Sequence, residues 1–186
     1  MFGTDKYLNT LGKLVSSGFV FSSFNDAAVQ KKSKRIVLRH DIAFSIESAL
    51  HIAKIDSDLG IQSYFFFMLT SNMYNLLSTV NRFMVHEIAS YGHIVSLHFD
   101  PTCYHDNFFK GFEFEYFAFQ GLFPTLPAPK VVSIHRPGVF LDDNNQILPG
   151  VDHTYLDKYF RDMVYVSDSG GRDISNRIDE LVSLNQ

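Results

Sequence analysis

RIVLRHDIAFSIESAL, residues 35–50, contains the features from which the fold class of this chain follows. Its apolar run at residues 36–38 is too short for a helix and is typical of a buried strand. The polar residues His40 and Asp41 follow that run. Ser45 then stands where a helix N-cap is expected, ahead of apolar residues at helical spacing. A buried strand that ends in polar residues and leads into a capped helix predicts an alternating α/β fold.

The same pattern recurs along the chain. Five strands are predicted, parallel in one sheet, near residues 35–40, 63–69, 94–98, 131–135 and 163–166. Apolar runs without alternation indicate strands that are covered on both faces, as they are in parallel sheets. Helices, which successive parallel strands require as crossovers, are predicted from Ser45 to Gly60, from Val80 to Gly92, over residues 106–123 and through Ile174 to Val182.

Polar residues at the ends of these strands predict a shared site. The carboxyl ends of parallel strands meet at one edge of the sheet, where α/β proteins place their ligands and catalytic groups. The predicted strand ends carry three histidines, three aspartates and an arginine: His40, Asp41, His98, Asp100, His135, Arg136 and Asp168. Residues two apart, such as His98 and Asp100, lie on the same face of a strand and can turn toward one ion. His135 is interpreted either as a ligand or as a residue that orients one.

Composition limits the classes to which the chain can belong. The 186 residues, 46% hydrophobic and 19% charged, suit a single domain over residues 1–186 with a net charge of −4. The basic run Lys31 to Arg35 is interpreted as a solvated loop, so we expect no nucleic-acid partner. There is no run of 18 apolar residues and no apolar N-terminal segment, so neither a membrane span nor a signal peptide is expected. The single cysteine, Cys103, excludes an internal disulfide and suits the cytoplasm.

Four stretches of the sequence resemble the polysaccharide deacetylases, also called carbohydrate esterase family 4, and in particular a divergent branch associated with surface-polysaccharide biosynthesis. The stretches are RIVLRHDIAFSIESAL (35–50), SYGHIVSLHFD (90–100), SIHRPG (133–138) and YVSDSGGR (165–172). The resemblance implies an incomplete, distorted (β/α) barrel. It also implies a hydrolase that uses a divalent metal, expected to be zinc, to remove an acetyl or other acyl group from a sugar.

The resemblance also assigns roles to the strand-end residues. Asp41 matches the catalytic base and could also be a metal ligand, while His98 matches a metal-binding histidine and Asp100 is expected as a replacement ligand. Arg136 matches the arginine that orients the base by a charge-assisted pair. The remaining residues are expected to complete the site: His135 as a catalytic residue, and Asp168 and His40 as substrate-binding residues.

The chain departs from the family pattern in its metal site and at its end. Ala43 stands where a metal-binding carboxylate is expected, and Thr102 stands where the second metal histidine is expected. The closing strand with its acid histidine has no counterpart before Gln186. Metal binding is therefore expected to be weak or absent, and an open sheet edge to favour a homo-oligomer. The alternatives are a catalytically impaired relative that binds a carbohydrate or a protein partner, and a shortened product of a longer gene.

Overall fold

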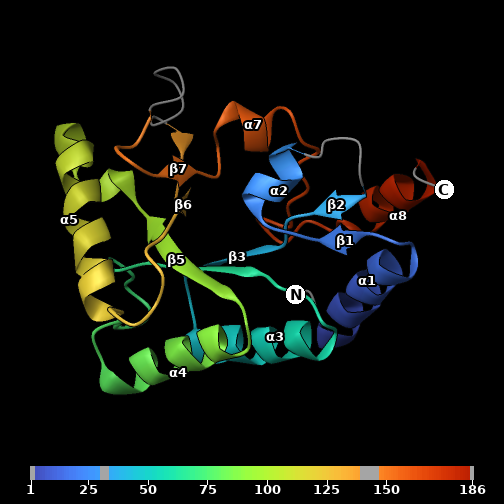
Figure 1. The fold of residues 1–186 in the computed structure, drawn as a ribbon, viewed down its shortest axis with the longest axis horizontal. Coiled ribbons are helices and arrows are strands. Elements are labelled where there is room, and N and C mark those ends of the chain that lie inside the picture. The colour runs from blue at the N-terminus through green and yellow to red at the C-terminus, as the bar shows by residue number, and fades with distance from the viewer. Residues whose placement is uncertain (1–2, 30–33, 139–146, 185–186) are drawn as a thin grey trace.

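Five strands form one parallel sheet in the computed structural model, which describes residues 3–29, 34–138 and 147–184. They lie side by side in chain order (Figure 1), with bounds β3 (Arg39–Ile42), β4 (Tyr64–Phe67), β5 (Ile94–Phe99), β6 (Val131–Ile134) and β7 (Asp152–His153). Each neighbouring pair is parallel, and Phe66 lies opposite Asp41 on one side and Ser96 on the other. The predicted α/β class and parallel sheet are thereby confirmed.

Strand β4 shows that the sheet is covered on both faces. All four of its residues are buried. Successive residues of a strand point to opposite faces, so Phe65 and Phe67 pack into the main hydrophobic core with the helices. Tyr64 and Phe66 pack on the other face, in a second cluster that includes Phe24. A strand with two apolar faces is what the unbroken apolar run predicts.

Three helices cover the face that carries Phe65: α3 (Ile46–Asp58), α4 (Thr79–Ser90) and α5 (Phe108–Leu122). Figure 1 shows α3 and α4 along one side of the sheet and α5 across one end. The hydroxyl of Ser45 accepts a hydrogen bond from the backbone N–H of Ser48 at 3.0 Å, and Ser78 caps α4 through Asn81 at 3.2 Å. Each cap satisfies a helical N–H that has no partner within the helix. All three predicted helices are confirmed.

The remaining described elements flank these layers: α1 (Thr4–Ser16), β1 (Val20–Phe21), α2 (Phe24–Val29), β2 (Arg35–Ile36), the 3-10 turns η1 (Pro101–Cys103) and η2 (His105–Asn107), α7 (Asp157–Phe160) and α8 (Ser175–Leu184). The predicted last helix is confirmed as α8. Leu14 of α1 packs against Ile178 and Val182 of α8, so the first and last helices share a small core of their own.

One predicted strand is wrong, and the strand predicted near residues 35–40 is confirmed only over its last residues. Residues 163–166 form no strand, and β7 takes the place beside β6. Residues 35–36 pair with β1 in a separate two-stranded sheet, so β3 begins only at Arg39. Both differences have one cause: pairing depends on which segment reaches an open edge, and a short apolar run carries no information about its partner. Residues 31–33 of the predicted basic loop lie outside the described residues.

The main sheet is curved. Ser133 of β6 donates a hydrogen bond from its hydroxyl to Oδ2 of Asp41 in β3 at 3.0 Å. These strands are three places apart in the sheet, which in a flat sheet corresponds to about 14 Å. A direct side-chain contact over that span requires the sheet to curl toward the face that carries Asp41. We call this face the concave face.

Candidate functional site

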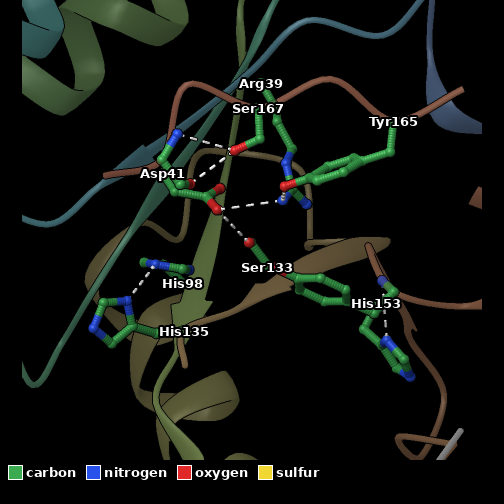
Figure 2. A network of polar contacts seen from close by, with 10 residues as sticks. Arg39, Asp41, His98, Ser133, His135, His153, Tyr165 and Ser167 are labelled. Atoms are coloured by element: carbon green, nitrogen blue, oxygen red, sulfur yellow. Dashed lines mark hydrogen bonds and ion pairs between the residues drawn. The ribbon is translucent and has the colours of Figure 1, made fainter. Parts of the chain in front are cut away.

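Asp41 lies at the carboxyl end of β3 on the concave face, between a hydroxyl and a guanidinium (Figure 2). Its Oδ2 atom accepts the hydrogen bond from Ser133 and lies 3.6 Å from Nη2 of Arg39. The Asp41 side chain is still 29% exposed. The carboxylate is thus held on one side and open to solvent on another.

Arg39 is the cationic partner of Asp41. It lies two residues before Asp41 in the same strand, so both side chains project from the same face. The guanidinium carbon lies 5.5 Å from the ring centres of Tyr155 and Tyr165, and Nη2 donates to the Tyr165 hydroxyl at 3.1 Å. Burial acts to lower the pKa of Arg39, but the Asp41 carboxylate and the two tyrosines outweigh it and raise the pKa above its ordinary value. Arg39 therefore stays charged beside Asp41.

A pair of histidines follows on the same face. Nε2 of His98, at the end of β5, lies 3.1 Å from Nδ1 of His135, just after β6. Burial lowers the pKa of His98, and the nearby Asp41 carboxylate only partly opposes this effect. The imidazole of His98 is therefore neutral near pH 7.

His40 does not join this group, because neighbouring residues on a strand point to opposite faces. Its Nε2 atom lies 3.0 Å from Oδ2 of Asp56 in α3 and 3.2 Å from the hydroxyl of Tyr7 in α1. The Tyr7 hydroxyl also donates to Asp56 at 2.6 Å. The structure thus gives His40 a place in a polar cluster on the helical side of β3, away from the open side of Asp41.

The structure places Arg136 at the surface and gives Asp100 a role as a helix cap. Arg136 is exposed, with a φ of 48°, whereas Arg39 forms an ion pair with Asp41. The expected pairing of Arg136 with Asp41 stays a prediction. Asp100 follows the last residue of β5 and caps η1, where Oδ1 accepts from the backbone N–H and the hydroxyl of Thr102 at 3.0 and 2.6 Å.

Asp168 lies in an exposed turn. Its carbonyl accepts hydrogen bonds from the backbone N–H groups of Gly171 and Arg172 at 3.0 and 3.1 Å. Its carboxylate is one of the negative charges that act on Tyr7. The segment that begins at Tyr165 therefore runs from the Arg39 side of β3 toward the polar cluster of His40.

A metal centre requires several donor side chains grouped around one point. Two imidazole nitrogens 3.1 Å apart could hydrogen bond or share an ion, since zinc ligands at about 2.0–2.1 Å in a tetrahedron lie about 3.4 Å from each other. Across residues 3–29, 34–138 and 147–184, however, no three His, Cys, Asp or Glu side chains are grouped so that they could hold a metal. Ala43 offers no donor and the Thr102 hydroxyl is bonded to Asp100. The residues do not fit a complete metal centre of the deacetylase type.

Sequence reasoning missed three members of the site. Arg39 had a usable signal, because residues two apart on a strand share a face and Asp41 was already a candidate. Ser133 lies within the apolar run Val131 to Ile134 as an ordinary strand residue and carries no comparable signal. Tyr165 was placed in a predicted strand that does not form, so its contact with Arg39 could not be foreseen.

No protein-family model, curated protein or solved structure matches this chain. The resemblance to the polysaccharide deacetylases therefore rests on the four sequence stretches alone. In the described part of the chain, no helix is long and apolar enough to cross a membrane. Fold and site together define an α/β protein with a parallel sheet whose concave face carries a carboxylate, a guanidinium and two histidines.

Proposed function

We propose that this protein is a hydrolase of the polysaccharide deacetylase type that removes an acyl group from a sugar. The observation that carries the proposal is the open carboxylate of Asp41, held by Arg39 and Ser133 at the carboxyl edge of a parallel sheet. Ligand sites in α/β folds lie at that edge. The four deacetylase-like stretches contribute Arg39, Asp41, His98, Ser133, His135 and Tyr165 to it.

We also propose that the five-stranded sheet is the wall of an incomplete (β/α) barrel. Strands that follow the chain order in an all-parallel sheet are the arrangement of a (β/α) barrel wall. The contact of Asp41 with Ser133 across three strand steps supports closure of that wall toward the concave face. Arg39 of β3 also lies against Tyr155, which follows β7, so the first and last strands approach each other. We infer an open, distorted barrel with its site inside the wall.

In this mechanism Asp41 is the general base. Its carboxylate takes a proton from a water molecule, which attacks the acyl carbonyl, while Arg39 and Ser133 hold the carboxylate in place. His135 lies at the solvent side of the histidine pair and supplies a proton to the departing sugar oxygen or nitrogen. The neutral, buried His98 orients His135. Because the donor set for a metal is incomplete, no step is assigned to one.

A second function is favoured by that incomplete donor set. With alanine at 43 and with Asp100 and Thr102 bonded to each other, the described part of the chain has no complete set of the ligands that the deacetylase reaction uses. A relative that binds a carbohydrate or a protein partner without hydrolysis would need the concave face but not the metal. Binding without acyl release is the outcome that would identify it.

Acetate release from a panel of soluble N- and O-acetylated oligosaccharides, measured with and without added zinc, tests the proposal. The wild type should release acetate, and Asp41→Asn should reduce the rate by about 100-fold or more, because a positioned base contributes about 10²–10⁴-fold. Asp58→Asn changes an exposed aspartate of α3 in the same way and should leave the rate unchanged. Acetate release that Asp41→Asn does not slow would contradict the assignment of Asp41.

A further inference from the structure

The side chain of Tyr165 is an exposed aromatic surface next to the Asp41 carboxylate. The residue as a whole is 43% exposed. It lies in the segment that follows α7 and reaches β3 through its hydrogen bond with Arg39. Figure 2 shows the Tyr165 ring alongside Arg39, on the same side as Asp41. A partly exposed aromatic residue thus lies close to the carboxylate that is proposed as the catalytic base.

The ring is held in position despite its exposure. Its hydroxyl accepts the hydrogen bond from Arg39 at 3.1 Å, and its centre lies 5.0 Å from that of Phe160. Phe160 in turn packs against Tyr155 with 5.2 Å between the ring centres. A ring fixed at its polar tip and against a neighbouring ring has lost most of its freedom before a ligand arrives. Such preorganisation lowers the entropic cost of binding.

One guanidinium connects this ring to the carboxylate. Nη2 of Arg39 is 3.1 Å from the Tyr165 hydroxyl and 3.6 Å from Oδ2 of Asp41. The two groups therefore keep a fixed relation to each other. A ligand ring that rests on Tyr165 would hold its substituents within reach of Asp41, and the same contact would select ligands with a flat apolar face.

We propose that Tyr165 is the stacking platform for the sugar ring whose acyl group Asp41 acts on, and that Arg39 is the positioning residue that sets the platform relative to the carboxylate. This inference rests on the proposed sugar-directed function. One face of a pyranose ring presents C–H groups with partial positive charge, and the face of an aromatic ring is negative, so the two surfaces are complementary. The hydroxyl groups at the rim of the sugar stay in water or meet the polar residues around Asp41.

Calorimetric titration with the same acetylated oligosaccharides tests the platform by binding rather than by turnover. Tyr165→Ala should raise the dissociation constant by about tenfold, consistent with the energy of an aromatic contact. Tyr165→Phe keeps the ring and loses only the bond to Arg39, so its dissociation constant should stay within about threefold of the wild type. Phe114→Ala removes an exposed aromatic side chain of α5 and should change nothing. Circular dichroism and thermal melts check that each variant is folded.

The outcomes separate this inference from the proposed function. Saccharide binding that depends on Tyr165, with no acetate released, supports the platform and overturns hydrolysis. Equal affinity of the wild type and a folded Tyr165→Ala protein overturns the platform, whether or not acetate is released. Failure of the wild type to bind any oligosaccharide of the panel also overturns it. A folded Tyr165→Phe protein that binds as poorly as Tyr165→Ala would also overturn the platform, because the ring would then contribute no affinity without its hydroxyl.

Discussion

The direction of each side chain on β3 determines which partner Asp41 has in the site. Arg39 and Arg136 both stand next to predicted site residues, and only the former lies on the same strand face as Asp41. His40, between Arg39 and Asp41 in the sequence, turns to Asp56 on the other face. The groups available for chemistry therefore depend on which residues of the four-residue strand β3 face the concave side.

The substitution at position 43 leads to a prediction about zinc. The wild type should bind zinc weakly, because His98 and Asp41 survive while the second carboxylate is absent. Ala43→Asp restores an anionic oxygen donor and should tighten binding by at least about tenfold, since loss of outer-shell support alone costs 10–100-fold. Zinc titration by calorimetry measures both, with His98→Ala expected to abolish binding and the exposed His51→Ala expected to leave it unchanged.

Two results of this titration would count against the expectation. If neither the wild type nor Ala43→Asp binds zinc, the inherited metal site is lost and the binding function gains support. If the wild type already binds tightly, the departures at Ala43 and Thr102 matter less than the donor set indicates.

Helix α5 contributes a buried glutamate, and its titration should change the free energy of unfolding. Glu115 accepts a hydrogen bond from the Tyr104 hydroxyl at 2.7 Å, and its other oxygen is buried with no partner among the described residues. Burial raises the pKa of Glu115 to about 7, and the Asp100 charge adds to this, although the bond from Tyr104 acts in the opposite direction. Gly111 makes the contact possible, because a Cβ at that position would overlap the Tyr104 ring.

The expected result is a loss of stability as the pH rises. With an ordinary pKa of 4.5 in the unfolded chain and about 7 in the fold, the folded state holds a proton that the unfolded state releases. The free energy of unfolding should therefore fall between about pH 4.5 and pH 7, by at most about 3 kcal/mol, and then level off. Chemical denaturation at pH 5 and pH 8 measures this change. Glu115→Gln should remove most of it, and Glu113→Gln, an exposed change on the same helix, should not. An identical pH dependence in wild type and Glu115→Gln would contradict the prediction.

Among the described residues, the five-stranded sheet has its two edges at β3 and β7. Strand β7 has only two residues, which limits pairing there, whereas β3 has four. Edge strands with free backbone groups favour association, and exposed apolar side chains such as Phe44 and Phe83 add to the tendency. We therefore expect self-association that increases with concentration, measured by light scattering. A stable monomer at high concentration with a cooperative melt at high temperature would show that the edge is closed in another way.

Local pattern was sufficient for much of this fold. The unbroken apolar run of β4 predicts a strand buried on both faces, and Ser45 marks the start of α3, because these signals depend on residues a few positions apart. The alternation of strands and helices then predicts a parallel sheet with its polar ends on one edge. For that reason the sequence alone predicts that Asp41, His98 and His135 lie close together.

Pairing and direction depended on the tertiary structure. Residues 152–153 rather than 163–166 complete the sheet, because the partner of an edge is chosen by contacts between distant segments. The first strand of the main sheet begins at Arg39, and that starting point sets which side chains face Asp41. The bond between Asp41 and Ser133 requires curvature of the whole sheet, which no run of neighbouring residues encodes. Local sequence therefore determined which residues could meet, and the packing of distant segments determined which of them do.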